Sequence, residues 1–381
     1  MIYFDNSATT QTLSEAAARA HRAMTQEFFN PAAAYDAAFA VEKAVGDARA
    51  FAASTIGAEP GEIIYTSGGT ESNNAAFFGT LRAIRGKKRI VTSEVEHPSV
   101  FETAAVAAKL FEAELFYAPL CPDGTVDVDR LSDVLNADTS LVSIMHVNNE
   151  LGSVNDLDRI AAKVRALAPN AILHADGVQA YMKVDVRRLP IDMYSVSAHK
   201  IHAPKGVGFL YARKGVRFVG GQIGGGQERN LRSGTTNVPG ILGFDTAIRA
   251  YRANERAWHT QMFNVKKRLY DDLMTLPDVV LNGPSIENGA PHILNLSFLG
   301  VRGEVLMHAL ERCGVIVSTG SACSAKKQGK NRILNAVGIS GARQEGAIRF
   351  SFCPFNTEQE ADAAANAIEE QLKILRRYRR R

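Results

Sequence analysis

Between about residues 60 and 215, short apolar runs alternate with stretches of helical pattern, and this alternation restricts the possible folds more than any other feature. The apolar runs are rich in Ile, Val, Leu and Tyr, and they read EIIYTS, RIVTSE, ELFYAP, LVSIMHV, AILHAD, MYSVSA and VGFLYA. Helix-like stretches such as VFETAAVAAKLFEA and LDRIAAKVRALA lie between several of them. Such alternation is typical of βαβ units around a buried, largely parallel sheet. We therefore predict an α/β fold.

The length of the chain predicts two domains, because 381 residues are too many for one compact core. We expect a large domain at residues 13–250 and a smaller α+β domain at residues 251–381. The N-terminal segment 1–12 is expected to pack on the smaller domain. A long helical stretch near residues 245–276 is expected to cross from one domain to the other.

Composition and charge argue against two classes of protein. The net charge of +4 is small for this length, so composition does not indicate a nucleic-acid-binding protein. No apolar stretch is long enough to span a bilayer, and the N-terminus carries neither the basic nor the long apolar region of a signal peptide. We therefore expect a soluble, cytoplasmic protein that is not associated with a membrane.

The four cysteines, Cys121, Cys313, Cys323 and Cys353, are widely spaced, and the sequence contains no C-x-x-C. In a cytoplasmic enzyme this spacing argues against a disulfide framework and against a zinc ribbon. A functional cysteine is therefore expected to act as a thiol. We expect Cys313 to lie in the core, because it enters an apolar stretch.

A glycine-rich turn follows the first expected strand. Ser67, Gly68, Gly69 and Thr70 lead into a helix that begins near Glu71. Glycines allow a sharp turn, and the free N–H groups at a helix start favour a phosphate. The spacing matches neither nucleotide-binding glycine signature. A phosphate site and a plain tight turn are both compatible with this stretch.

Two further strand ends carry polar residues that fit cofactor chemistry. Asp176 closes AILHAD, and Lys200 follows MYSVSA. In isolation Asp176 could instead cap a helix, and a metal site with His174 lacks a credible third ligand. Because a phosphate site, a carboxylate and a lysine would meet at one edge of a parallel sheet, the set fits pyridoxal phosphate. Its aldehyde needs a lysine, and its ring nitrogen needs a carboxylate. No metal is predicted.

The sequence resembles the cysteine desulfurases, which are fold-type I pyridoxal-phosphate enzymes of the class V aminotransferase group. The resemblance covers essentially the whole chain and rests on eight stretches in the family's order: FDNSATT, TSGGTESNN, EHPSV, HVNNELG, HADGVQA, SAHKIHAPKG, GGGQERNLRSGTTN and STGSACS. It implies a large domain with a mainly parallel seven-stranded sheet and a smaller α+β C-terminal domain. It also implies a homodimer that acts on L-cysteine.

The resemblance assigns roles around the pyridine ring. Lys200 matches the lysine that forms a Schiff base with the cofactor. His97 matches the histidine that stacks on the ring and handles protons. Asp176 matches the partner of the ring nitrogen, and Gln179 matches the donor to the phenolic oxygen.

The same resemblance assigns the cofactor's phosphate and the substrate. Gly69, Thr70, Ser197 and His199 match phosphate contacts. Thr235 matches the residue that reaches the phosphate bound by the neighbouring subunit. For the substrate, the resemblance assigns Asn149 and Arg349, whose guanidinium suits a carboxylate.

Cys323 is implied to be the catalytic nucleophile, on a mobile loop at about residues 319–332. In this family the cysteine takes sulfur from L-cysteine, L-alanine leaves, and a persulfide remains for transfer to an acceptor protein. An iron–sulfur scaffold and a tRNA sulfurtransferase are both compatible acceptors.

Two other functions remain open from the sequence. A selenocysteine lyase, or another class V aminotransferase or lyase, would keep Lys200 and Asp176. A tRNA-binding protein would use the basic C-terminal tail LKILRRYRRR. A solvated helix end whose basic residues are favoured by the helix dipole is the preferred explanation of that tail, so we do not predict direct nucleic-acid binding.

Overall fold

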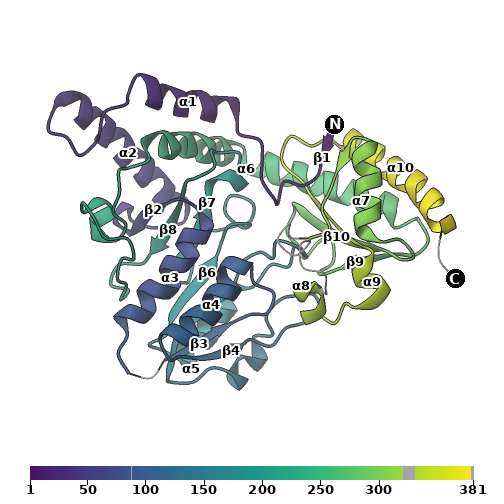
Figure 1. The fold of residues 1–381 in the computed structure, drawn as a ribbon, viewed down its shortest axis with the longest axis horizontal. Helices are drawn as coiled ribbons and strands as arrows, with labels where there is room; N and C mark the ends of the chain where they lie inside the picture. The colour runs from purple at the N-terminus through teal and green to yellow at the C-terminus, as the bar shows by residue number, and fades with distance from the viewer. Residues whose placement is uncertain (87, 321–330, 379–381) are drawn as a thin grey trace.

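The computed structural model describes residues 1–86, 88–320 and 331–378. In Figure 1 a larger group of elements, which contains α1 to α5, lies to the left of a smaller group formed mainly by the C-terminal third of the chain. The long helix α6 (Val238–Leu273) runs between them. It begins earlier than the helix that we expected at residues 245–276.

A seven-stranded sheet forms the centre of the larger group. All seven expected strands are present: β2 (Ile63–Thr66), β3 (Arg89–Thr92), β4 (Glu114–Tyr117), β5 (Thr139–Ser143), β6 (Ile172–Asp176), β7 (Met193–Ser197) and β8 (Gly208–Ala212). Their order is β2-β8-β7-β6-β5-β3-β4, and only β8 runs against the others. The predicted α/β fold with a mainly parallel seven-stranded sheet is confirmed.

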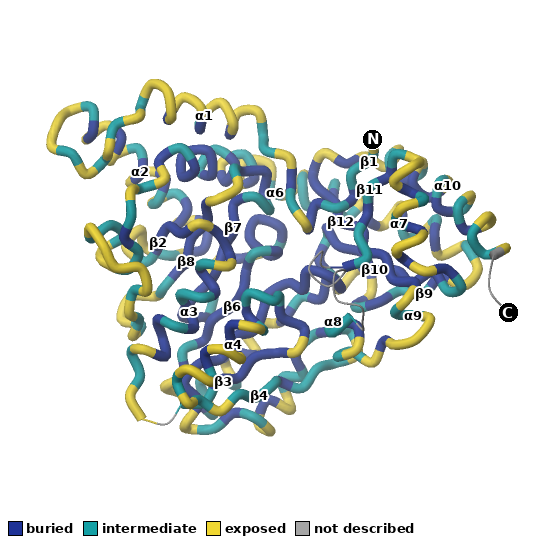
Figure 2. The backbone as a smooth tube through the Cα atoms, in the orientation of Figure 1, coloured by how far each residue is buried: buried dark blue, intermediate teal, exposed yellow. Residues whose placement is uncertain are grey.

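Helices cover this sheet and bury most of its apolar strands. The covering elements are α1 (Ser14–Thr25), α2 (Asp36–Thr55), α3 (Gly69–Ala83), α4 (Pro98–Leu110), α5 (Leu157–Leu167) and the first half of α6. Most residues of β2, β5, β6 and β7 are buried, which explains why these strands read as continuous apolar runs without alternation (Figure 2).

The smaller group is built on a three-stranded antiparallel sheet of order β12-β10-β9. Its strands are β9 (Val279–Asn282), β10 (Ile293–Phe298) and β12 (Ala347–Ser351), and its helices are α7 (Gly303–Arg312), α8 (Arg332–Ala336), α9 (Gly341–Glu345) and α10 (Glu358–Leu375). Phe298, Phe350 and Ile368 belong to its own hydrophobic core. This core is separate from that of the large sheet, as expected for an α+β unit.

The N-terminal segment adds to the smaller group. Strand β1 (Ile2–Tyr3) pairs in parallel with β11 (Val315–Ile316), and Phe4 is fully buried in the smaller core. The predicted boundary between residues 250 and 251 falls inside the continuous helix α6, whose two halves contribute to different cores. The division at residues 12/13 and 250/251 therefore stays a prediction.

Candidate active site

The carboxyl ends of the parallel strands meet beside the smaller group and line a cavity of about 320 Å³. Ten of the residues singled out in the sequence line it: Gly69, Thr70, His97, Asn149, Asp176, Gln179, Ser197, His199, Lys200 and Arg349. The first nine lie at the ends of strands of the large sheet or in the segments that follow these strands, whereas Arg349 lies on β12. Because parallel strands end at one edge, segments far apart in the sequence supply a single site.

Lys200 lies in a single 3₁₀ turn directly after β7, and its ammonium points to the N-terminal segment. Its Nζ donates to the carbonyl oxygens of Ser7, at 2.6 Å, and Ala8, at 2.7 Å. Burial, and next the nearby Arg349 guanidinium, lower the pKa of Lys200 to about 8. Lys200 therefore gives up its proton far more easily than an exposed lysine, as a nucleophilic amine must.

This pKa predicts how fast the cofactor-free protein captures pyridoxal phosphate. Only the neutral amine attacks an aldehyde, so the rate of capture should rise with pH, reach half its maximum near pH 8 and level off well above that pH. The measurement is the rate at which visible absorption appears after mixing, at pH values on both sides of 8. A midpoint near the ordinary lysine pKa of about 10.4 would contradict the geometry described here.

Asp176 ends β6, is 4% exposed, and is held by two donors. Its Oδ1 accepts from the backbone N–H of Val178 at 2.9 Å, and its Oδ2 accepts from Nδ2 of Asn73 at 2.8 Å. No α-helix follows Asp176 directly, so the alternative role as a helix cap does not apply. These two hydrogen bonds fix the carboxylate in the lining of the cavity.

His97 is the N-cap of α4, and its mostly buried side chain lines the same cavity. Its Nδ1 accepts from the backbone N–H of Ser99 at 3.1 Å and lies 2.7 Å from Oγ of Ser99. Burial lowers the pKa of His97, so the ring is neutral at neutral pH. Because Nδ1 accepts a hydrogen bond, the proton of the neutral ring is on Nε2.

Asn73 and Ser99 join these two residues, and the sequence reasoning missed both. Nδ2 of Asn73 donates to Oγ of Ser99 at 2.8 Å as well as to Asp176. Asn73 lies one helical turn after Gly69, within TSGGTESNN, and Ser99 lies within EHPSV. In the sequence, the only indication that they belong to the site was their position inside these two stretches.

The glycine turn at the start of α3 has no room for side chains. Gly68 is the N-cap of α3 with φ of 141°, a conformation that favours glycine. A Cβ on Gly69 would lie 2.5 Å from Cγ2 of Val178, and one on Gly68 would lie 3.4 Å from Oγ of Ser197.

Burial and neighbouring lysines lower the pKa of His199 to about 4, so this residue is a neutral hydrogen-bonding group here.

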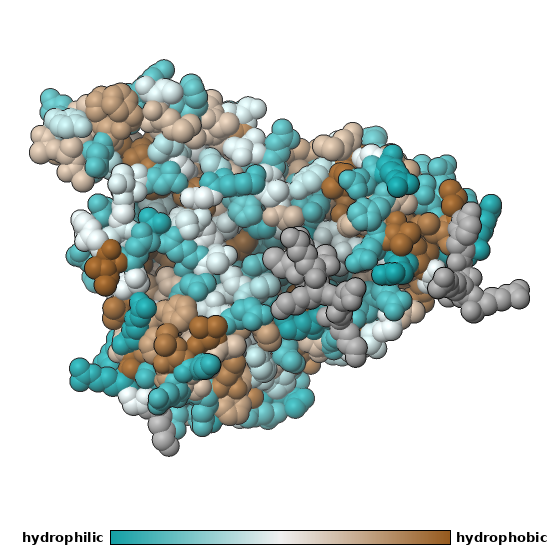
Figure 3. All heavy atoms as spheres, viewed as in Figure 1, coloured by the Kyte–Doolittle hydropathy of each residue, from teal (hydrophilic) through white to brown (hydrophobic). Residues whose placement is uncertain are grey.

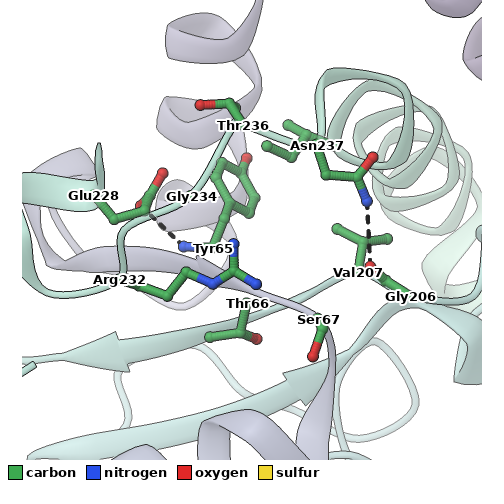
Figure 4. Close-up of a pocket in the computed structure, with 11 residues that line it drawn as sticks. Tyr65, Thr66, Ser67, Gly206, Val207, Glu228, Arg232, Gly234, Thr236 and Asn237 are labelled. Carbon is green, nitrogen blue, oxygen red and sulfur yellow. Dashed lines mark hydrogen bonds between the residues drawn. The ribbon is translucent and has the colours of Figure 1, made fainter. Parts of the chain in front are cut away.

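Among the described residues, one predicted site residue does not line the cavity. Thr235 is exposed, and its neighbours Gly234 and Thr236 line a second, smaller cavity beside Ser67, which Figure 4 shows. Cys323 lies in residues 321–330, outside the described part of the chain, as does most of the expected loop at residues 319–332.

Cys313 is exposed, so the expectation that it lies in the core is wrong. The residue caps the C-terminus of α7, and Gly314 with φ of 79° then turns the chain into β11. The apolar stretch therefore becomes buried only after Cys313. Cys121 is half-buried at a turn that Gly124 closes, and Cys353 is buried.

Comparison with known proteins identifies the family. Residues 2–364 match the family described as "Aminotransferase class-V". The chain is 36% identical to "Cysteine desulfurase" of Trichormus azollae, over 99% of this chain and 94% of that protein. A solved "NIFS-LIKE PROTEIN" superimposes with a TM-score of 0.91 at 33% identity, over 98% of this chain and 99% of that one.

The chain belongs to the cysteine desulfurases. The solved structure titled "SspA in complex with cysteine" also matches, with a TM-score of 0.81 at 28% identity, over 94% of this chain and 100% of that one. Enzymes of this family depend on pyridoxal phosphate, so the residues of the cavity can be tested against that cofactor.

The residues of the desulfurase cavity fit pyridoxal phosphate. The cavity offers an amine of lowered pKa, a buried carboxylate and a glycine turn at a helix start. It also holds buried polar atoms that have no hydrogen-bond partner within the described residues: Oγ of Ser7, Oδ1 of Asn73, Oδ1 of Asn149 and Nε of Arg349. Buried polar atoms normally have partners, so these orphaned atoms indicate a polar ligand.

Neither a candidate metal-ion cluster nor a candidate membrane-spanning helix occurs in the described ranges. Residues 1–86, 88–320 and 331–378 contain no group of three or more His, Cys, Asp or Glu side chains placed to hold a metal ion. Within the same ranges, no helix combines the length and the apolar character needed to span a bilayer.

Proposed function

We propose that this desulfurase removes sulfur from L-cysteine, releases L-alanine and leaves a persulfide on Cys323. The observation that carries the proposal is that Lys200 and Arg349 line the same cavity from different sheets. This arrangement gives one amino acid both an aldehyde-binding amine and a carboxylate anchor. Pyridoxal phosphate, when bound, supplies an electron sink for cleavage of the bond between carbon and sulfur.

Lys200 would hold the cofactor's aldehyde, and Asp176 would keep the ring nitrogen protonated. Asn73 holds the Asp176 carboxylate in place through its 2.8 Å hydrogen bond. His97, neutral and with its proton on Nε2, would move a proton above the ring. Gln179 donates through Nε2 to the carbonyl oxygen of Ser7 at 2.9 Å, which places its amide near Lys200.

The cofactor's phosphate would bind at the start of α3. Gly69, Thr70, Ser197 and His199 line the cavity from two segments of the chain. The N–H groups at the helix start favour an anion, and Ser197 and His199 add side-chain hydrogen bonds. This anchor would hold the ring over Asp176.

The substrate carboxylate would bind Arg349 with help from Asn149. The Arg349 side chain is 3% exposed, and its Nε has no partner within the described residues. Asn149 lines the same cavity, and its Nδ2 would donate to the carboxylate, since its Oδ1 can only accept. The Nε–H of the Arg349 guanidinium is free to donate to a carboxylate, and a charged donor makes a strong hydrogen bond to such a group.

Cys323 is proposed as the nucleophile because both flanks of residues 321–330 are fixed at the cavity. Ser318 exchanges backbone hydrogen bonds with Arg349, at 2.6 and 3.2 Å. On the other side, Nδ2 of Asn331 donates to Glu150 at 2.7 Å. Cys323 follows Gly320 by three residues, so chain length alone keeps their Cα atoms within about 11 Å.

The proposed reaction balances without a further reagent. The Cys323 thiolate attacks the sulfur of L-cysteine, and the bond between that sulfur and the β-carbon breaks. The β-carbon takes up the electron pair of the broken bond and one proton, so L-alanine leaves and the transferred sulfur stays on Cys323. A mass spectrum of the protein after L-cysteine alone should show one added sulfur atom on the peptide that contains Cys323. Absence of this addition would contradict the proposal.

We also propose a homodimer, in which Thr235 of one subunit contacts the phosphate bound by the other. Large apolar side chains are exposed on the larger group: Phe28 at 68%, Phe39 at 52%, Val219 at 47% and Ile223 at 96%. Figure 3 shows hydrophobic residues gathered at the left edge of the molecule, around the loop that follows β8. Thr235 is exposed in the same connection between β8 and α6.

Ile223→Glu should therefore shift the protein from dimer to monomer and weaken its hold on the cofactor's phosphate. A charge placed at a fully exposed position costs nothing in a monomer, but it costs much in an apolar interface. Sedimentation and cofactor retention after dialysis are the measurements. Val305→Glu on α7, at an apolar position that is 45% exposed, is the control and should leave the dimer intact. A wild-type monomer that retains full activity would contradict the proposal.

The sulfur acceptor and the location of the enzyme are proposed as well. We propose a cytoplasmic enzyme that passes sulfur to an acceptor protein, either an iron–sulfur scaffold or a tRNA sulfurtransferase. The described part of the basic tail contacts the chain itself: Lys373 pairs with Glu369 at 2.6 Å, and Arg376 donates to the carbonyl oxygen of Asp278 at 3.4 Å. No observation favours tRNA binding by this tail over these internal contacts.

A further inference from the structure

The guanidinium of Arg349 is already paired with a carboxylate of the same chain. Its NH2 donates to Oδ1 of Asp5 at 2.6 Å, and its NH1 donates to the carbonyl oxygen of Asn149 at 2.9 Å. The Arg349 side chain is 3% exposed and that of Asp5 is 19% exposed. Only Nε is left without a partner among the described residues. A substrate carboxylate would therefore approach a guanidinium that already has a counter-ion.

Asp5 is held in this position by its own backbone. Asp5 forms a parallel bridge with Ser351 at the end of β12. The backbone N–H of Ser351 donates to the carbonyl oxygen of Phe4 at 2.7 Å, and that of Ser7 donates to Oγ of Ser351 at 2.8 Å. Because β12 carries both Arg349 and Ser351, the strand that presents the guanidinium also fixes the carboxylate opposite it. The pair is thus a built feature of the fold.

The same N-terminal segment also contacts the cofactor side of the cavity. The carbonyl oxygen of Ser7 accepts from Lys200 at 2.6 Å and from Gln179 at 2.9 Å. Residues 5–8 therefore connect the guanidinium of the smaller group with the lysine of the larger group. A carboxylate bound at Arg349 would lie between this segment and Lys200, close to the charge of Asp5.

We propose that Asp5 competes with carboxylate ligands for Arg349, and so weakens the binding of the product L-alanine. This inference rests on the proposed role of Arg349 as the carboxylate anchor. Two negative charges would share one buried positive charge when a ligand is bound, and like charges at such short range repel strongly where little water screens them. Asp5 also neutralises Arg349 when no ligand is bound, which avoids an uncompensated buried charge. Product release is faster as a result.

The test compares two ligands and two variants of the cofactor-loaded protein by titration calorimetry. L-Alanine carries the carboxylate, whereas ethylamine offers only the amine. Asp5→Asn keeps the shape of the side chain and removes its charge. We expect this variant to bind L-alanine about tenfold more tightly and to bind ethylamine with unchanged affinity. Asp245→Asn removes a carboxylate of similar exposure (17%) that pairs with Arg249 away from the cavity, and it should change neither affinity.

Each outcome separates this inference from the proposed function. If wild-type protein prefers L-alanine to ethylamine, but Asp5→Asn binds L-alanine equally or more weakly, Asp5 positions Arg349 and the competition is disproved. If neither the wild-type protein nor Asp5→Asn prefers L-alanine to ethylamine, Arg349 is not the anchor and both proposals fail. Asp5→Ser, which is smaller and also neutral, should repeat the result of Asp5→Asn if the charge alone matters. Thermal melting of each variant shows that it is folded.

Discussion

Lys200→Ala should reduce the release of alanine and sulfide from L-cysteine by more than about a thousandfold. Proton transfer by a positioned side chain contributes up to about 10⁴-fold in many enzymes, and Lys200 is also the proposed amine for covalent attachment. The variant should still bind pyridoxal phosphate through the glycine turn and Asp176. Treatment with borohydride should then no longer fix the cofactor to the protein, whereas it should do so in the wild type. The measurements are turnover and the mass of the reduced protein.

The control for this variant is Lys205→Ala. Lys205 is exposed and lies five residues further along the chain, so the change removes a nearby positive charge without touching the cavity. We expect wild-type turnover and normal covalent attachment. If Lys200→Ala kept both properties, the lysine that holds the cofactor would have to be another residue.

Cys323→Ser should abolish sulfur transfer and leave binding of L-cysteine unchanged. A hydroxyl is a much poorer nucleophile than a thiolate at neutral pH, so we expect sulfide release to fall by at least about a thousandfold. Cofactor binding should stay normal, because the residues of the cavity are untouched. The measurements are sulfide release with a reductant and the change in visible absorption when L-cysteine binds.

Cys313→Ser is the matched control, because Cys313 is an exposed thiol away from the cavity. It tests whether any accessible thiol can collect sulfur, and we expect wild-type rates. Full activity in Cys323→Ser, combined with loss of activity in Cys313→Ser, would transfer the role of nucleophile to the other cysteine.

The large sheet could be predicted from the sequence because its strands are buried on both faces. Runs such as EIIYTS and AILHAD have no polar alternation, and they are separated by helical stretches, so both signals point to the same parallel architecture. Predicted site residues then lie at the ends of several of these strands, as Asp176 ends β6 and Lys200 follows β7. Local pattern and topology together therefore placed these residues at one edge.

The contacts between distant segments could not be predicted in this way. Asn73 contacts Asp176 and Ser99 only because three segments converge at the sheet edge, and no local pattern encodes that meeting. The ion pair of Asp5 with Arg349 spans almost the whole chain, since it depends on the bridge between Asp5 and β12. The prediction that Cys313 lies in the core was wrong for a local reason. The apolar stretch does not show where the turn at Gly314 begins.

The most direct test of desulfurase chemistry in this chain is one experiment on the purified, cofactor-loaded protein. Visible absorption is recorded first, and L-cysteine is then added together with a thiol reductant while alanine and sulfide are measured. We predict an absorption band that changes on addition of L-cysteine, followed by alanine and sulfide in equal amounts. An unchanged band, or alanine without sulfide, would contradict the proposed function.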